Sequence, residues 1–170
     1  MNIVNTREDI KMGDGNAVLL VRYSEEGIGH TLSNLTKHRF EFRGHTCLST
    51  EGVLHAVKVN DIEFQKRWVK TYGIAAQKIP SRYRQDDWKK TQTLWWMGEP
   101  MGRTTTKYRE FVKELYWEVS RHSIDYREAL IASRGKKLIH PLGPEKPHLT
   151  VLTRKEFTTA LEWCRDKWIV

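Results

Sequence analysis

Three side chains capable of acid–base chemistry lie between Ser49 and Lys58. Glu51, His55 and Lys58 stand at i, i+4 and i+7, so a helix would carry them on one face. A carboxylate, an imidazole and an amine on one stripe can perform general acid–base or nucleophilic catalysis where the stripe lines a pocket. The alternative is a solvated face with a ladder of charges. The apolar residues between the three favour a covered helix, in which burial would lower the pKa of Lys58.

A second polar pair, Ser33 and Asn34, follows Gly27 and Gly29 in a segment expected to be a loop. The hydroxyl of Ser33 and the amide of Asn34 are suited to hydrogen bonds with a sugar or a phosphate. An ordinary polar turn is the simpler alternative.

Aromatic and basic side chains mark a third segment. Trp88, Leu94 and Trp95 at i, i+6 and i+7 predict a buried helical seam, which leaves Trp96 either to pack or to stack on a base. Arg103 ends the predicted loop Gly98–Arg103 and has the geometry to hold a phosphate with two hydrogen bonds. A surface arginine with no ligand is the alternative.

Other chemistry lacks a pattern in the sequence. No His or Cys residues show metal-ligand spacing, and the glycine motifs of Rossmann, P-loop and serine-hydrolase sites are missing. Cys47 and Cys164 form no CxxC pair and are expected to be reduced thiols. We therefore expect no metal and no cofactor.

The composition is that of a basic domain in the cytoplasm. The chain has 170 residues, which suits one domain over residues 1–170. Its net charge of +8 suits an anionic partner, although solubility alone would also explain the charge. The longest apolar run, Ala17–Val21, is far shorter than the ~20 residues that span a bilayer. Met1–Lys11 is polar and does not read as a signal peptide.

The strands and helices expected around these residues indicate an α+β fold. It is a single compact domain, mostly helical with a small β-sheet. Strands are expected at Asn16–Tyr23, at Arg39–Arg43 and around Leu138, with a loop between the first two. Helices are expected at Glu51–Val59, after Asp61, from Asp86 or Asp87 to about Gly98, at Thr104–Val119, at Asp125–Ser133 and at Arg154–Trp168. The last begins with a capping box at Thr153 and Glu156.

The order of three short motifs resembles the NADAR (YbiA-like) superfamily. They are Leu32–Leu35, Phe40-x-Phe42-x-Gly44 and Ser49-x-Glu51-x-x-x-His55-Ala56-x-Lys58, followed by Asp87-Trp88 and Met97. The departures, His55 in place of a usual Gln and no WG pair near Leu142, are those of a divergent member of the kind found in T-even-type bacteriophages.

The resemblance implies an N-glycosidase that removes ADP-ribose from guanine bases in DNA and so counters a DarT-type toxin in the host cytoplasm. Glu51 would be the acid–base catalyst, and Lys58 would orient it or attack ribose C1. Ser33 and Asn34 would hold ribose hydroxyls beside His55. Trp96 would stack on a base and Arg103 would meet the pyrophosphate. The partner would be ADP-ribosylated nucleic acid, with DNA favoured, or an ADP-ribose-like nucleotide.

Two other functions stay open. The departures at His55 and at the WG position also suit a protein that binds nucleic acid or ADP-ribose without cleaving it. An N-glycosidase acting on a phosphoribosyl metabolite is the third possibility, and it would lack the steep salt dependence of DNA binding.

Overall fold

The first sheet joins the N-terminal strands to a strand from the C-terminal third of the chain. In the computed structural model, which describes residues 9–11 and 17–169, β1 (Asp9–Lys11) is antiparallel to β2 (Ala17–Leu20). β2 is parallel to β7 (Lys137–Ile139), with its buried residue Leu19 opposite the equally buried Leu138. The strand predicted at Asn16–Tyr23 is confirmed in shortened form, although Asn16 lies outside the described residues, and the strand predicted around Leu138 is confirmed.

The second sheet is a tight hairpin. β3 (Phe40–Phe42) pairs with β4 (His45–Cys47), and its burial alternates as predicted, with Glu41 exposed between two buried phenylalanines. Arg43 and Gly44 form the connection with φ of 47° and 81°, which suits the two-residue turns that join antiparallel strands.

The longer helices begin within two residues of their predicted starts, and each has a side-chain cap. They are α3 (Thr50–Ala56), α4 (Ile62–Trp68), α6 (Thr106–His122), α7 (Ile124–Ala132) and α8 (Arg154–Trp168), with side-chain caps at Ser49, Asp61, Thr105, Ser123 and Thr153. The capping box at the start of α8 is present. The shorter helices are α2 (Ile28–Thr31), which lies in a predicted loop, α5 (Asp87–Thr91) and the 3-10 turns Gly73–Gln77, Ser81–Tyr83 and Pro147–Leu149.

The prediction of a helix up to Gly98 is wrong. α5 ends when Gln92 adopts a left-handed φ of 56°, and a hairpin follows, formed by β5 (Thr93–Trp96) and β6 (Glu99–Gly102). Met97 and Gly98 turn the chain with φ of 46° and 89°. Aromatic residues favour a strand as much as a helix, so the tryptophan spacing alone did not distinguish the two structures.

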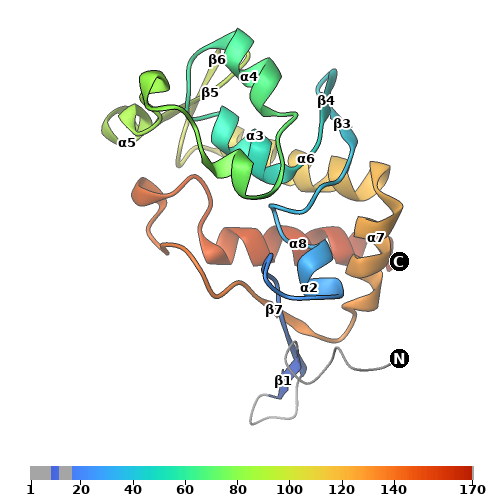
Figure 1. Cartoon of the computed structure of the whole chain (residues 1–170). Coiled ribbons are helices and arrows are strands. Elements are labelled where there is room, and N and C mark those ends of the chain that lie inside the picture. The colour runs from blue at the N-terminus through green and yellow to red at the C-terminus, as the bar shows by residue number, and fades with distance from the viewer. Residues whose placement is uncertain (1–8, 12–16, 170) are drawn as a thin grey trace.

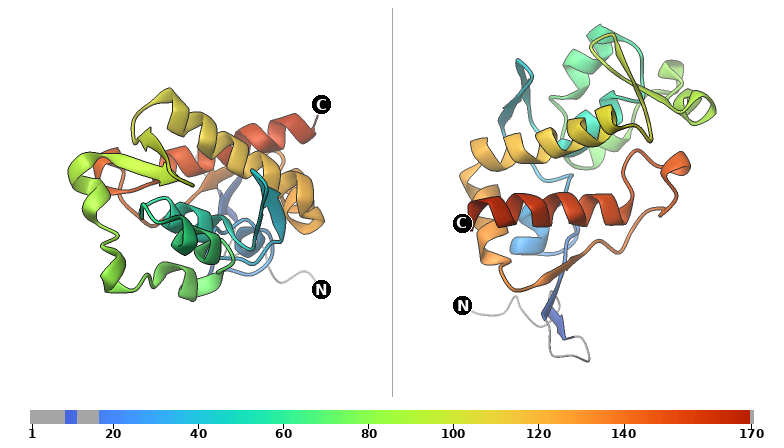
Figure 2. Two further views of the ribbon diagram at one scale, coloured as in Figure 1. Left: turned by 90° about the horizontal axis from the view of Figure 1, so that it is seen from above. Right: turned by 180° about the vertical axis from the view of Figure 1, so that it is seen from behind.

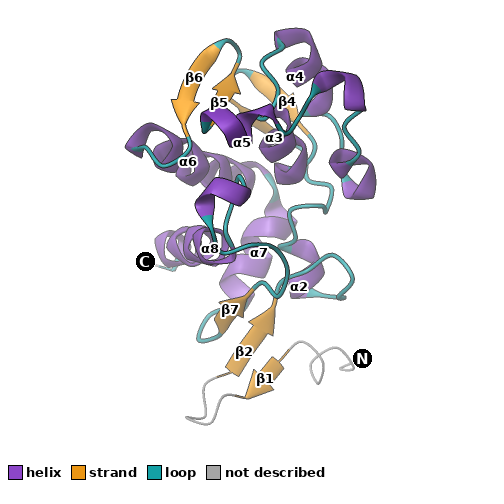
Figure 3. Ribbon diagram, turned by 90° about the vertical axis from the view of Figure 1, so that its left-hand side faces the viewer, coloured by secondary structure: helices purple, strands orange, loops and turns teal. Residues whose placement is uncertain are grey.

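The α6 helix connects the two halves of the domain. Its predicted apolar stripe is buried against β3, α7 and α8, and α6 and α8 run side by side when the molecule is seen from behind (Figure 2). In Figure 1 the helices α3–α5 and the β5–β6 hairpin lie on one side of α8, while the β1–β2–β7 sheet lies on the other. Figure 3 shows the same division from the side. The chain is thus a compact α+β domain, mostly helical with small sheets, as predicted.

Candidate functional site

The N-terminus of α3 is docked on the turn that follows α4. The Ser49 hydroxyl accepts a hydrogen bond from Gly52 N at 2.9 Å and donates one to the Thr71 carbonyl at 2.7 Å. A Cβ at Gly52 would lie 2.8 Å from the carbonyl oxygen of Trp68, closer than side-chain carbons approach. Glycine at this position therefore allows the close packing that sets the position of the helix.

The Ser33–Leu35 loop is held by α3 and by the 3-10 turn Gly73–Gln77. The Asn34 carbonyl accepts a hydrogen bond from Glu51 N at 2.9 Å, and the Leu35 carbonyl accepts one from Gly73 N at 2.7 Å. A Cβ at Gly29 would clash with the Leu20 carbonyl, so glycine is needed where α2 approaches β2. These contacts place the loop directly beside the first turn of α3.

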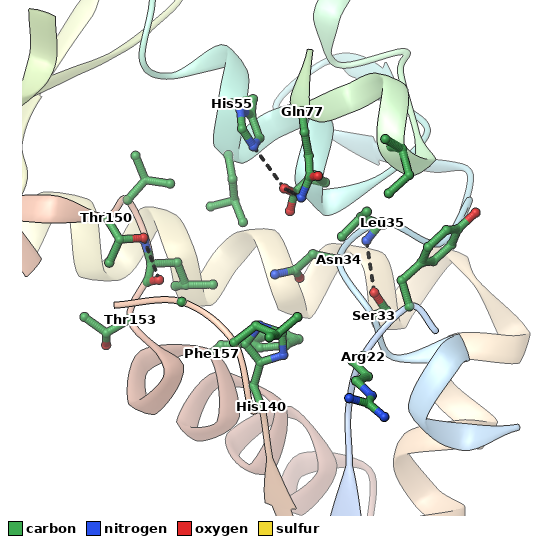
Figure 4. A pocket seen from close by; sticks show the side chains of 18 of the residues that line it. Arg22, Ser33, Asn34, Leu35, His55, Gln77, His140, Thr150, Thr153 and Phe157 are labelled. Carbon is green, nitrogen blue, oxygen red and sulfur yellow. Dashed lines mark hydrogen bonds and ion pairs between the residues drawn. The ribbon is translucent and has the colours of Figure 1, made fainter. Parts of the chain in front are cut away.

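A cavity of about 540 Å³ lies between the two halves of the domain. Its walls come from α3 and the Ser33–Leu35 loop, from the residues that follow β2 and β7, and from the segment leading into α8 (Figure 4). Small-molecule sites typically occupy about 300–1,000 Å³, so the cavity is large enough for a nucleotide-sized ligand.

Glu51, His55 and Lys58 lie on one side, as predicted, and all three line this cavity. The predicted helix to Val59 is too long, because α3 ends at Ala56 and Lys58 lies in the turn that follows. His55 Nε2 lies 2.9 Å from Glu51 Oε1, and Lys58 Nζ lies 3.2 Å from His55 Nδ1. The Glu51 and His55 side chains are only 11% and 14% exposed. The three groups form one continuous chain of contacts, with the imidazole in the middle.

Two placements of the proton satisfy this chain. In the first, a neutral His55 donates from Nε2 to Glu51 and accepts at Nδ1 from the Lys58 ammonium. In the second, a protonated His55 donates from both nitrogens, to Glu51 and to a neutral Lys58 amine. The geometry therefore suits proton transfer between Lys58 and Glu51 through the imidazole ring.

The surroundings change the pKa values at both ends of the chain. Burial by itself raises the pKa of Glu51, but hydrogen bonds from His55 and Gln77 and the charges of His55 and Lys58 together bring it below the ordinary 4.5. Burial lowers the pKa of Lys58 below the ordinary 10.5, although Glu51 and Asp86 favour its charged form. Glu51 is thus a carboxylate at neutral pH, and the Lys58 ammonium is a stronger acid than that of an ordinary lysine.

The predicted polar pair also lies at the cavity. Asn34 Oδ1 accepts hydrogen bonds from the hydroxyls of Thr50 at 2.8 Å and Tyr116 at 2.7 Å. This arrangement leaves the amide nitrogen to donate, and in Figure 4 the Asn34 side chain extends into the cavity. Ser33 lines the cavity, and its hydroxyl accepts a weaker hydrogen bond from Leu35 N at 3.3 Å.

Several residues that line the cavity were not predicted from the sequence. Gln77 donates to Glu51 Oε1 at 3.0 Å from a 3-10 turn with no recognisable motif. Arg22 and His140 follow the parallel strands β2 and β7, and the His140 ring contacts the Val21 carbonyl at 2.7 Å and Phe157 edge-on. Ligands often bind at the carboxyl ends of parallel strands, but the parallel pairing of β2 and β7 was not predicted, so no signal in the sequence pointed to Arg22 and His140.

The structure corrects the expectation for Trp96. The side chain is only 5% exposed and packs against Phe42 and Phe111, with ring centroids 5.2 and 5.5 Å apart. It does not line the cavity around Glu51. In β5, alternate residues point to opposite faces, so Trp96 joins the core and its neighbour Trp95 is the half-buried one, the reverse of the helical expectation.

The structure also corrects the expectation for Arg103. Its guanidinium is buried at 1% exposure and donates to both carboxylate oxygens of Glu156, at 3.1 and 2.7 Å, and to the Thr150 carbonyl at 2.8 Å. An arginine whose donors are used in this way supports the wall of the cavity and cannot also hold a phosphate.

Other classes of site find no support in the described part of the chain. Within residues 9–11 and 17–169, no three His, Cys, Asp or Glu side chains come together as a metal site requires. Both cysteines are free and buried. No helix among these residues combines the length and the apolar character needed to cross a membrane, and most of the segment Met1–Lys11, expected not to be a signal peptide, lies outside them.

Fold and site together define an α+β domain with a polar cavity beside a Glu–His–Lys helix face. The chain belongs to the family described as bacteriophage protein GP30.3, whose model matches residues 27–166. It is 35% identical over 138 residues to the "Uncharacterized 17.1 kDa protein in Gp30-rIII intergenic region" of Enterobacteria phage T4, an alignment that covers 79% of this chain and 88% of that protein. No solved structure matches the chain.

The assignment to the NADAR superfamily is therefore wrong, because the family whose model spans most of this chain is GP30.3. The residues that carried the resemblance have local structural roles here: Phe40 and Phe42 are buried, Gly44 makes a turn and Ser49 caps α3. Such roles recur in unrelated folds, so short motifs built from them are poor family markers. The expected bacteriophage origin is supported by the family and by the T4 relative.

Proposed function

We propose that this phage protein is an N-glycosidase that removes ADP-ribose from guanine bases in DNA. The observation that best supports the proposal is the contact chain Glu51–His55–Lys58 along the wall of a nucleotide-sized cavity. The net charge of +8 suits an anionic substrate. In the cytoplasm of an infected host, this activity would reverse the effect of an ADP-ribosylating toxin.

Each step of the reaction has a candidate group. Cleavage of the bond between ribose C1 and a base nitrogen requires a proton for the base, stabilisation of an oxocarbenium-like centre, and water. The Lys58 ammonium donates the proton as the C1–N bond breaks and its electron pair stays on the base. The Glu51 carboxylate stabilises the positive centre and takes a proton from the water whose oxygen bonds to C1. His55 then returns that proton from Glu51 to Lys58, which restores the starting state.

Polar groups on the opposite walls would bind the substrate. The Asn34 amide and the Ser33 hydroxyl face the ribose hydroxyls, while Arg22 and His140 at the strand ends meet the pyrophosphate. Arg22 takes the role first expected of Arg103, since its side chain is 39% exposed and ion-paired with Glu25 rather than enclosed.

A covalent route through Lys58 is a variant of the same activity. The neutral amine would attack C1 and displace the base, and ring opening would give a Schiff base that water hydrolyses. Borohydride added during turnover would trap this intermediate as a stable adduct on Lys58, detectable by peptide mass spectrometry. A lack of adduct under active turnover would leave the direct attack of water.

The decisive experiment uses an oligonucleotide with one ADP-ribosylated guanine. The wild-type chain should release ADP-ribose and restore the unmodified oligonucleotide, as measured by mass spectrometry. Glu51→Gln should stop release, while the control Glu63→Gln, at an exposed glutamate of α4, should not.

Two outcomes would support the alternatives. Tight, selective binding of the modified oligonucleotide without release would indicate a binding protein. Cleavage of a free phosphoribosyl compound, with little salt dependence and no cleavage of modified DNA, would indicate a metabolite substrate.

A further inference from the structure

A second cavity, of about 440 Å³, shares Lys58 with the first. Its other walls come from the connection between α3 and α4, from the 3-10 turn Ser81–Tyr83, and from α5 and β5. Lys58 is thus a wall residue of both spaces, and a ligand that reaches Lys58 from the second cavity comes within one side chain of the His55–Glu51 contact.

The second cavity has an aromatic lining. Trp95 is half-buried and lines it from β5, and Trp88 lines it from α5. Trp88 is only 2% exposed, and its indole N–H has no hydrogen-bond partner among the described residues. A buried donor without a partner costs free energy, but this N–H is shielded from solvent, so Trp88 supports the wall and Trp95 is the more exposed of the two rings.

Charged side chains of both signs line this cavity. Its walls carry the cations Lys58, Arg82 and Arg84 and the carboxylates Asp61 and Asp87. Arg84 is paired with Asp87 but is 73% exposed. Arg82 is also exposed and lies 4.7 Å from the centroid of the Tyr83 ring, with no carboxylate partner in the described part of the chain. Phosphate groups entering this cavity would therefore meet accessible guanidinium groups.

Aromatic faces beside exposed cations are the usual combination for single-stranded nucleic acid, since bases stack and phosphates pair with charges. We infer that the second cavity binds a single-stranded segment of nucleic acid, with a base against Trp95 and phosphates at Arg82 and Arg84. On the proposed function, on which this inference rests, a neighbouring modified nucleotide of the same strand would reach Glu51 in the first cavity.

The inference can be tested by binding alone. Fluorescence anisotropy with a labelled, unmodified 12-nucleotide DNA should show that Arg82→Ala with Arg84→Ala weakens binding at least tenfold. It should also reduce the slope of log K against log salt by about 1.4, since each phosphate contact on a single strand contributes about 0.7. The control, Arg109→Ala with Arg121→Ala on the exposed face of α6, removes the same charge and should cost less than threefold.

Stacking is tested separately through Trp95→Ala. Loss of one stacked base should weaken binding by about 5- to 150-fold, with little change in the salt slope. Since Trp95 is half-buried, Trp95→Phe should keep the fold and recover most of the affinity. Circular dichroism on each variant checks that the domain is folded before binding is compared.

Three results would overturn the inference: unchanged affinity in the folded arginine pair variant, an equal loss in the α6 control, or tighter binding of duplex than of single-stranded DNA. Because no cleavage is measured, the outcome is separable from the proposed activity. Binding that depends on Arg82, Arg84 and Trp95 in a chain that releases no ADP-ribose would uphold the second cavity and reject the glycosidase.

Discussion

The buried guanidinium of Arg103 and the buried carboxylate of Glu51 have opposite surroundings. Arg103 donates to both oxygens of Glu156 and to the Thr150 carbonyl, and its guanidinium lies 5.1 Å from the centroid of the Tyr108 ring. Glu156 is itself part of the capping box of α8. The Arg103 side chain is 1% exposed and the Glu156 side chain 34%, so the guanidinium joins the β5–β6 hairpin to α8 from the buried side of the pair.

Glu51 is also buried, with 8% exposure against 1% for Arg103, but it is only partly bonded. Its side-chain hydrogen bonds, from His55 and Gln77, both reach Oε1, and the residue lines a cavity. The two groups differ in their surroundings: the hydrogen-bonding groups of Arg103 face protein, whereas Glu51 has unused acceptor positions beside a cavity. A buried charge whose contacts are completed by protein stabilises the fold, whereas one with spare capacity toward a cavity is available to a ligand.

The largest expected effect is on turnover, at Glu51. Glu51→Gln keeps the size and an acceptor oxygen but removes the negative charge, so release of ADP-ribose should fall by about 10²- to 10⁴-fold. The free energy of unfolding, measured with urea at pH 7, should change by about 1 kcal/mol or less. A variant that unfolded readily while the folded fraction stayed active would place Glu51 with Arg103 among the structural groups.

The reverse pattern is expected at Arg103. Arg103→Met should reduce the free energy of unfolding by about 3 kcal/mol, because Glu156 loses a buried partner and the Thr150 carbonyl loses its donor. The control is Arg154→Met, which breaks the exposed pair with Glu145 and should cost less than about 1 kcal/mol. Equal costs for the two variants, by urea denaturation, would contradict the structural role of Arg103.

An intermediate effect is expected at Gly52, where a substitution should change both the free energy of unfolding and the position of Glu51. Gly52→Ala would force a carbon against the Trp68 carbonyl, at a cost of about 1–3 kcal/mol, and would displace Glu51. Turnover of the folded variant should fall as well. Gly135→Ala is the control, since a Cβ there meets nothing within 4 Å and only the left-handed φ of 76° is strained, at about 1 kcal/mol. Its turnover should stay at the wild-type level.

The smallest effect is a pH dependence of stability. The pKa of Glu51 is lower in the folded chain than its ordinary 4.5, so ionised Glu51 contributes stability above pH 4.5, which is lost as the pH falls through the folded-state value. The stability difference between wild type and Glu51→Gln should therefore shrink as the pH falls below about 4.5. Urea midpoints at pH 7, 4 and 3 measure it, and a difference that grows toward acid would show that the pKa is raised instead.

Sequence reasoning was most reliable where the signals are local. The predicted capping box at Thr153 and Glu156 is present, and Ser49 and Asp61, just before the predicted helices, each accept a hydrogen bond from the first turn. The helix predicted over Thr93–Gly98 was wrong because tryptophans suit a strand as well as a helix. The left-handed φ of Gln92, Met97 and Gly98 ends α5 and turns the chain into a hairpin. Trp96 changed from a candidate ligand contact to a core residue for the same reason.

The sequence by itself determined that Glu51 and His55 meet, because residues at i and i+4 lie together on any helix, and Lys58 follows in the next turn of the chain. Only the tertiary structure decided that these side chains border a cavity, that Gln77 and His140 complete its surroundings, and that Arg103 is used up by Glu156. These contacts join segments far apart in the chain. They depend on which surfaces are buried together, and no local spacing of residues carries that information.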